Sequence, residues 1–537
     1  MTRLALVATA AVALATSATL GSLVPPAAAQ APDQQADRQL GNVHFATSCN
    51  EVAQRRFDRA MRYQHSFWYR QSKELFESVL AADPGCGIAY WGIALSLWNN
   101  PHNVPPAPNL APALAAIEKG KAVGAKSERE RDFIAALAVL YTGYDKIYYR
   151  VRLQGYLKAM EALAAKYPDD DETQIAYAIT LNVAASPADK TYANQLKGAA
   201  ILEPIFARLP QHPGVAHYLI HLYDYPAIAQ HGLDAARRYA AIAPAAPHAQ
   251  HMPSHIFTRV GAWKDSISSN LASVKAAKAD KEAGDQLHGE DYLVYAYLQL
   301  AQDANARAVV DEIGQSPTAN PDAFGAWFAQ AASPARYMVE RGDWRGAAAL
   351  PVHPTKFAHV EAITHFARAL GAARSGNAEA SQADIARLAE LRDKLREAKN
   401  AYWAGQVDIQ HQIATAWLLL AQGKTEDAVK AMSAAADAED KTEKSPVTPG
   451  PLAPARELLG AMLLERGAAA EALACFEATL SKEPNRFNAI AGAAMAAEKL
   501  GDKAKATAYY EKLVALADGS SSDRPALAAA KQYLAKK

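Results

Sequence analysis

The feature that most constrains the fold is a repeat of about 34 residues near the C-terminus. Gly467 and Gly501 lie one repeat length apart, as do the aromatic residues Phe476 and Tyr510. In each repeat the glycine separates two stretches with apolar residues at helical spacing, and Pro484 follows the second stretch of the first repeat. A unit of this length cannot bury its apolar face alone, so consecutive units must stack. The repeat therefore predicts an all-α chain of helical hairpins stacked into a solenoid.

The same pattern occurs upstream in a weaker form. Ala60, Tyr63, Phe76 and Pro84 stand at repeat spacing in RFDRAMRYQHSFWYRQSKELFESVLAADPGC. Segments typical of β-strands are almost absent, so we expect the whole chain to be a helical superhelix.

This pattern of small residues at helix crossings, a turn glycine and a closing proline resembles the tetratricopeptide repeat (TPR). The segments HSFWYRQSKELFESVLAADPGCGIAYWG, HMPSHIFTRVGAWKDS and DYLVYAYLQ further resemble a group of exported bacterial TPR proteins, over most of residues 44–300. The resemblance implies a concave groove, lined by the first helix of each repeat, in which ligands bind. It implies no particular reaction.

The first 29 residues read as a secretory signal peptide. Arg3 precedes an apolar run and then small residues, which predicts cleavage after Ala29 and a mature chain that starts at Gln30. We therefore expect a periplasmic or secreted protein.

The sequence after the signal peptide divides into six predicted segments. They are N-terminal repeats at 30–105, a helical segment at 106–200, His-rich repeats at 201–300, further helical repeats at 301–440, a linker at 441–454 and a C-terminal repeat pair at 455–537. A Pro-rich insertion follows residue 98.

Charge and motifs exclude several classes of function. Lys and Arg total 56 and Asp and Glu total 56, so no basic excess indicates nucleic acid or an anionic membrane as a partner. After the signal peptide no apolar run is long enough to span a bilayer. The HExxH, GxSxG, P-loop and GxGxxG motifs are missing from the sequence. Any catalysis would then have to come from a bound metal.

Export changes the interpretation of the three cysteines. Cys49 and Cys86 could form a disulfide in an oxidising compartment, although two buried thiols are the alternative. Cys475 lies in an Ala- and Leu-rich helix and is interpreted as a packing residue.

Histidines cluster in the middle of the chain. Seven of the 15 lie between residues 212 and 255. His217 and His221 are four residues apart, as are His251 and His255, so each pair shares one face of a helix. The second pair follows the first by one repeat length, which puts both pairs at the same place in consecutive repeats.

A register set from Gly261 places these pairs at positions that, by the resemblance to TPR proteins, face the groove. The same register adds His288, Asp291 and Tyr295 from the next repeat. The predicted metal ligands are His217, His221, His251, His255, His288 and Asp291. Asp224, His248, Glu290 and Tyr295 are predicted to orient these ligands through hydrogen bonds, as Tyr223 and Tyr292 could.

Imidazoles with one carboxylate suit a divalent transition metal, namely Zn, Fe, Cu or Ni. Six ligands exceed one tetrahedral set, so the site would hold two ions or some residues would be second shell. Three functions stay open. In the first, the chain is an exported scaffold whose groove binds a protein, peptide or small ligand beside the metal. In the second, it is a metal-dependent hydrolase or oxidoreductase. In the third, it is a metal-free interaction module.

A second feature lies in the N-terminal repeats. Ile88, Trp91, Leu95 and Trp98 are predicted to form an aromatic wall of the groove, near His102 and suited to a peptide or a ring-bearing ligand. The alternative is that the two tryptophans pack under the Pro-rich insertion. The more scattered histidines are expected to be structural: His65, His353, His359, His365 and His411.

Overall fold

The computed structural model describes residues 39–316 and 324–536, which are helical and contain no strand. The predicted signal peptide lies outside these residues. None of the described helices has the length and apolar character needed to cross a membrane.

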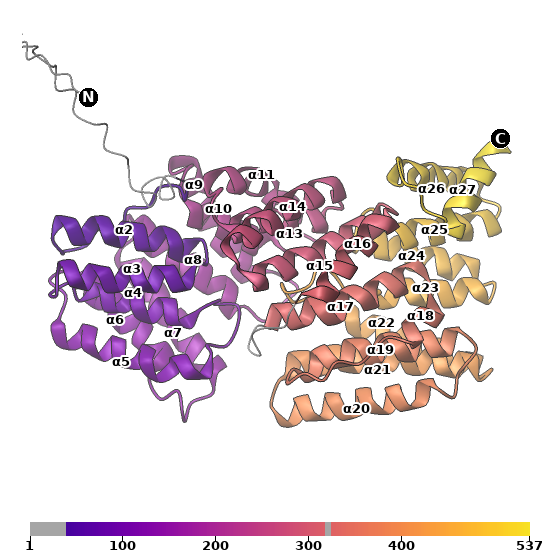
Figure 1. Ribbon diagram of the computed structural model, residues 1–537, viewed down its shortest axis with the longest axis horizontal. Helices are drawn as coiled ribbons and strands as arrows, with labels where there is room; N and C mark the ends of the chain where they lie inside the picture. Colours follow the sequence, from indigo (N-terminus) through magenta and orange to yellow (C-terminus); the bar gives the residue numbers. More distant parts are fainter. Residues whose placement is uncertain (1–38, 317–323, 537) are drawn as a thin grey trace, which may run out of the picture.

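The helices pack mainly against their neighbours along the chain, as in a stack of hairpins (Figure 1). In the predicted C-terminal repeats, α23 and α24 are joined at Gly467 and α25 and α26 at Gly501, both with positive φ. The TPR-type helical-hairpin solenoid predicted from the sequence is thereby confirmed.

The N-terminal part of the stack comprises α2 (Glu51–His65), α3 (Tyr69–Ala82), α4 (Ile88–Trp98), α5 (Ala107–Val123), α6 (Glu128–Tyr141), α7 (Tyr149–Lys166), α8 (Asp171–Ala184) and α9 (Ala193–Arg208). The predicted Pro-rich insertion forms the turn between α4 and the start of α5.

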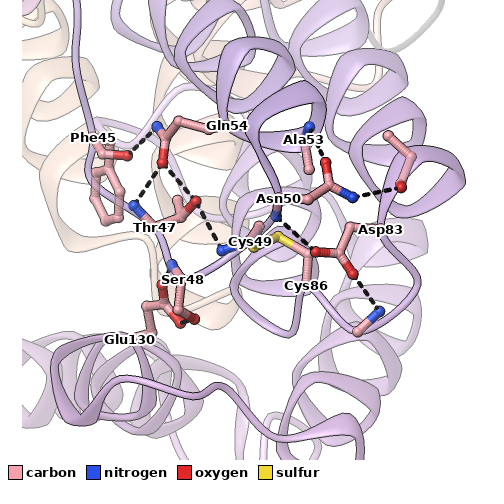
Figure 2. The surroundings of a disulfide bond; sticks show 12 residues. Phe45, Thr47, Ser48, Cys49, Asn50, Ala53, Gln54, Asp83, Cys86 and Glu130 are labelled. Carbon is pink, nitrogen blue, oxygen red and sulfur yellow. Dashed lines mark hydrogen bonds between the residues drawn. A yellow bond between two sulfur atoms is a disulfide. The ribbon is translucent and has the colours of Figure 1, made fainter.

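Cys49 and Cys86 form a disulfide that ties the start of α2 to the turn between α3 and α4 (Figure 2). Asn50 reinforces the same junction. Its side chain accepts a hydrogen bond from the Ala53 amide at 2.9 Å, which caps α2, and donates one to the Ala82 carbonyl at 2.9 Å. Cys475, in α24, is a buried free thiol.

The His-rich middle of the chain comprises α10 (Pro213–Tyr223), the short 3-10 helix η1 (Ala229–Gly232), α11 (Leu233–Ile242), α12 (Pro247–His251), α13 (Pro253–Arg259), α14 (Trp263–Asp280), α15 (Ala283–Gln299) and α16 (Asp303–Gln315).

The C-terminal part comprises α17 (Phe324–Arg341), α18 (Trp344–Ala348), α19 (Ala358–Arg374), α20 (Ser381–Glu397), α21 (Ala401–Ala421), α22 (Thr425–Asp440), α23 (Ala455–Glu465), α24 (Ala469–Lys482), α25 (Phe487–Lys499), α26 (Lys503–Leu516) and α27 (Pro525–Ala535).

Segments distant in sequence close on the His-rich helices from two sides. On one side α2 packs against α10. On the other, α25 packs against α15, and the Trp263 indole donates to the Asn485 carbonyl at 2.8 Å. Gly261 has φ +70°, and a Cβ there would lie 2.3 Å from the Pro484 carbonyl oxygen, so this contact requires glycine. The His-rich helices therefore occupy the interior of the solenoid.

The predicted linker at 441–454 is non-helical, and it differs from an ordinary solvent-exposed connection. Glu443 and Thr448 are buried, and the Lys444 side chain is 5% exposed. The Lys444 ammonium lies 3.2 Å from Asp224, and the Tyr292 hydroxyl donates to the Pro446 carbonyl at 3.1 Å. Its polar groups are bonded to the His-rich helices, which explains why this segment lies inside the molecule.

Candidate metal centre

Six histidines from consecutive repeats converge in the interior. We call the set the His centre: His217 and His221 on α10, His248 and His251 on α12, His255 on α13, and His288 on α15. Helices α12 and α13 are separated at Met252, because Pro253 has no N–H to continue the helical ladder.

The His centre divides into two triads. In the first, His217 Nε2 lies 3.1 Å from both His221 Nε2 and His248 Nε2. The second consists of His251, His255 and His288. Each histidine of a triad contributes one ring nitrogen, and the three nitrogens of a triad all lie within 4.8 Å of one another. The triads adjoin, since the ring centroids of His221 and His255 are 6.2 Å apart.

Outer hydrogen bonds determine which nitrogens of the second triad carry protons. His251 Nδ1 lies 2.7 Å from Asn270 Oδ1, and the Asn270 amide nitrogen donates to Ser266 O, so His251 Nδ1 must be the donor. His255 Nδ1 likewise donates to the Asp224 carboxylate at 2.9 Å. Each neutral ring therefore has an unprotonated Nε2, and these two atoms are 3.0 Å apart. Two lone pairs at this distance repel unless a cation lies between them.

The first triad shows the same arrangement at one residue. His217 Nδ1 donates to the His65 carbonyl at 2.7 Å, which leaves its Nε2 as an acceptor toward the other two rings. A histidine whose outer nitrogen donates to a carbonyl, amide or carboxylate oxygen is the usual form of a metal ligand.

Burial keeps these imidazoles neutral. The pKa of His217 and of His288 is lowered to about 3, and desolvation is the main cause for both. The pKa values of His221, His248 and His251 fall well below the usual value, first through desolvation and then through neighbouring histidines. A proton shared between rings is therefore unfavourable near neutral pH, whereas a metal ion would use the neutral lone pairs.

Asp224 is the carboxylate that supports the centre. Besides His255, it accepts from Arg259 Nε at 2.8 Å and lies 3.2 Å from Lys444 Nζ. These cations and His255 hold the pKa of Asp224 well below its usual range against the effect of burial. Burial lowers the pKa of Lys444 to about 8. Asp224 was predicted to support the ligands and lies against the outer nitrogen of His255, and Lys444 comes from the predicted linker.

The histidines do not line an open groove, in contrast to the prediction. His217, His221, His251 and His255 are each 5% exposed or less. The Phe67 ring covers His217 at 4.3 Å between centroids, and His102 lies 4.2 Å from His221. Phe67 has φ +57°, unusual for an aromatic residue and found where the surrounding structure imposes it. Residues from the turn between α2 and α3 and from the Pro-rich insertion thus cover the face that the repeats leave concave.

Three predicted residues on α15 face away from the His centre. Asp291, predicted as a ligand, accepts from Ser333 Oγ at 3.0 Å and lies 3.6 Å from Arg336 Nε. Glu290 accepts from Gln286 at 2.8 Å, and Tyr295 donates to Glu483 at 2.9 Å.

Helical geometry explains this difference. A residue three positions after His288 is rotated by about 60° to one side, whereas the residue four positions after it is rotated by about 40° to the other. Tyr292 takes the latter position, and its ring packs 4.7 Å from His251 and 5.1 Å from His255. His248, predicted as second shell, instead belongs to the first triad. Tyr223 lies outside the centre and donates to Glu203.

A third group, His65, Glu172 and His212, also has the composition of a metal site. In this group the ring nitrogens already have hydrogen-bond partners within the protein. His212 Nδ1 accepts from the Val215 amide at 3.3 Å and its Nε2 donates to Glu172 at 2.9 Å, while His65 Nε2 lies 3.2 Å from the same carboxylate. No two nitrogen lone pairs of this group face each other, so its geometry does not require an ion. The prediction assigns His65 a structural role, consistent with this geometry.

Trp91 and Trp98 are buried and do not form the wall of an open groove. Trp91 stacks on Phe45 at 5.4 Å and Trp98 packs on Tyr156 at 5.7 Å. Both nevertheless line a cavity of about 60 Å³, together with Leu95 and Phe67. Ile88 is part of the hydrophobic core. The cavity therefore ends at the ring that covers the first triad.

Sequence reasoning missed Phe67, Asn270 and Lys444. Each comes from outside the histidine-bearing helices, and no spacing rule relates them to those helices. Phe67 lies in HSFWYR, a segment of the resemblance to exported TPR proteins, and that is the one signal that could have drawn attention to it.

No protein-family model and no curated protein sequence matches the chain. Among solved structures, a human IFIT1 dimer with m7Gppp-AAAA is 11% identical and has a TM-score of 0.35, with 80% of this chain and 90% of that chain covered. Yeast Tom70 is 13% identical, covers 90% of this chain and 88% of its own, and has a TM-score of 0.28. The APC/C hetero-tetramer Cut9–Hcn1 is 12% identical, covers 90% and 96%, and has a TM-score of 0.27. The likenesses concern the stacking of helices and carry no conclusion about function.

Proposed function

We propose that this helical repeat protein holds two divalent transition-metal ions in the His centre, one in each triad. The observation that carries the proposal is the pair of unprotonated nitrogens of His251 and His255, 3.0 Å apart. Two nitrogens bound to one ion at about 2.0 to 2.1 Å lie about 2.8 to 3.4 Å apart when the angle between them is about 90° to 110°. The separation thus suits two ligands of one ion.

The donor set narrows the choice of ion. Neutral imidazoles favour Zn, Cu, Fe or Ni, and the nearest carboxylate, Asp224, is already bonded to His255, Arg259 and Lys444. This arrangement does not suit Ca or Mg, which prefer oxygen ligands.

Metal analysis tests the proposal directly. Untagged full-length protein should contain metal, up to two equivalents, after purification or after loading with Zn, Cu, Fe or Ni and removal of the excess. A His251→Ala/His255→Ala variant should lose the second ion and keep the first. The matched control His365→Ala/His411→Ala changes two histidines outside the centre and should keep both. Wild-type protein that retains no metal after loading would refute the proposal.

A metalloenzyme is the second candidate, favoured by one specific observation. Three protein ligands per ion leave a coordination position for water or substrate, as in catalytic zinc sites. The cavity lined by Trp91 and Trp98 ends at Phe67, which covers the first triad. We propose an apolar or ring-bearing substrate for this activity. Hydrolysis of such compounds by the loaded protein, or their oxidation with dioxygen supplied as the oxidant, would support it, provided that the activity is lost in a His217→Ala/His221→Ala variant, which lacks two ligands of the first triad.

The remaining proposals concern partners and location. A helical repeat scaffold offers extended surfaces suited to binding a protein or peptide, and that role would stand alone if no metal binds. We also propose export with cleavage after Ala29. N-terminal sequencing of protein from a periplasmic or secreted fraction should then begin at Gln30, and protein that retains Met1 would contradict export.

A further inference from the structure

A second cavity lies in the C-terminal half of the chain. It has a volume of about 80 Å³ and is formed between α17, α19, α21 and α22 and the 441–454 segment. Its lining combines an apolar wall with many polar and charged side chains, most of which are bonded to other residues of the protein. The cavity contains none of the six histidines of the His centre, although Arg259 and Lys444, which bind Asp224, also line it.

One wall of this cavity is aromatic. The rings of His359 and Trp403 stack face to face, with 4.3 Å between centroids and an angle of 16° between planes. Phe328 lies beside them, 6.1 Å from Trp403, and the aliphatic Ile363 and Val407 complete the apolar surface. Each ring covers one face of the other, so a bound ring would pack against the outer face or the edge of this stacked pair.

The polar atoms of the cavity are incompletely bonded. Within the described residues, neither ring nitrogen of His359 has a hydrogen-bond partner, although the side chain is only 8% exposed. Gln410 Oε1 and Glu443 Oε2 are also buried without a partner. The other oxygen of Glu443 is bonded, at 2.6 Å to Lys190 and at 2.9 Å to Tyr192, so the carboxylate is held in place. Buried polar atoms without partners are costly and uncommon in folded proteins.

The chemistry of these atoms defines their missing partner. A neutral imidazole offers one donor and one acceptor, while Gln410 Oε1 and Glu443 Oε2 can only accept. Burial lowers the pKa of His359 to about 4, which keeps the ring neutral at physiological pH. Among the donors of the lining, Arg259 and Lys444 are paired with Asp224, and Arg336 Nε, which has no hydrogen bond within the described part of the chain, lies 3.6 Å from Asp291. The unpartnered atoms of His359, Gln410 and Glu443 are mainly acceptors, so the complementary molecule must carry mainly O–H or N–H groups.

We propose that this cavity binds a small aromatic molecule bearing hydroxyl or amino groups, with its ring against His359 and Trp403 and its donors directed at His359, Gln410 and Glu443. A phenol and an aromatic amine share this chemistry. Phenylacetate does not, because at neutral pH it has a ring but no donor.

Isothermal titration calorimetry with tyramine tests the site. Tyramine combines a ring with a hydroxyl group and an ammonium group. The titration uses full-length protein stripped of metal with a chelator, so a phenol cannot bind through a metal ion and the result is independent of the His centre. We expect tyramine to bind at one site, and phenylacetate to bind at least about tenfold more weakly, as the loss of one or two hydrogen bonds implies.

Three variants locate the binding. His359→Phe keeps a ring against Trp403 but removes both nitrogens, and should weaken tyramine binding about 5- to 10-fold. Trp403→Leu removes the stacking surface and should weaken it further. The matched control Trp344→Leu changes a tryptophan that contacts Arg374 outside the cavity, and should bind as wild type.

The proposal fails if wild-type protein gives no binding heat with tyramine, as a cavity that holds only water would. It also fails if phenylacetate binds as tightly as tyramine or if His359→Phe binds tyramine as tightly as wild type. His359→Phe decides the question even if Trp403→Leu does not fold, because phenylalanine fills nearly the same space as histidine.

Discussion

Acid should destabilise the metal-free protein through the buried histidines. His217 and His288 have pKa values lowered to about 3 in the folded chain, against about 6.5 in an unfolded chain. Between these values the unfolded state binds more protons, so stability is full above pH 6.5 and is lost as the pH falls toward 3. At pH 5.5 each histidine costs about 1.4 kcal/mol, and the two together about 3 kcal/mol.

Urea unfolding of chelator-treated protein at pH 7.5 and pH 5.5 measures this loss. Buried carboxyl groups titrate in the opposite sense, because the pKa values of Glu290 and Glu439 are raised to about 7 by desolvation. The informative quantity is therefore the difference between wild type and a His217→Gln/His288→Gln variant, in which the carboxyl contribution cancels.

We expect the free energy of unfolding of wild type to fall by about 3 kcal/mol more than that of the variant between the two pH values. The control His231→Gln/His353→Gln replaces two exposed histidines and should show the wild-type pH dependence. Equal pH dependence in wild type and in the His217→Gln/His288→Gln variant would refute the reasoning, because the buried imidazoles would then titrate as they do in the unfolded chain.

Two further predictions concern stability. The Cys49–Cys86 bridge spans 37 residues. Its loss in a Cys49→Ser/Cys86→Ser variant should lower the free energy of unfolding by about 3 to 4 kcal/mol, because the unfolded chain gains loop entropy. An unchanged urea midpoint would show that the bridge does not stabilise the fold. Gly261→Ala should lower the free energy of unfolding by at least about 1 kcal/mol more than Gly467→Ala. Both glycines have positive φ, but only a Cβ at Gly261 would meet the Pro484 carbonyl. Equal losses of stability in thermal unfolding would contradict the close packing of this turn.

The candidate site was partly predictable, because helical periodicity places side chains reliably within one helix. The spacing of four residues within each pair, and of one repeat length between the pairs, brings His217, His221, His251 and His255 to one place. Asp291 was wrongly assigned as a ligand, because its position on α15 turns it toward Arg336. The register of that helix had to be chosen without a turn glycine to set it.

The sequence by itself determined the helical repeats, the turns at Gly467 and Gly501, and the faces of the helices that carry histidine. These depend on residue type and on spacing within one repeat or between neighbouring repeats. Only the tertiary structure decided that the concave face is filled, by Phe67 from one side and Lys444 from the other. It also decided which nitrogen of each ring is bonded outward, as for His251 with Asn270. Such contacts join residues whose separation in sequence follows no period, so they arise from the closure of the solenoid on itself.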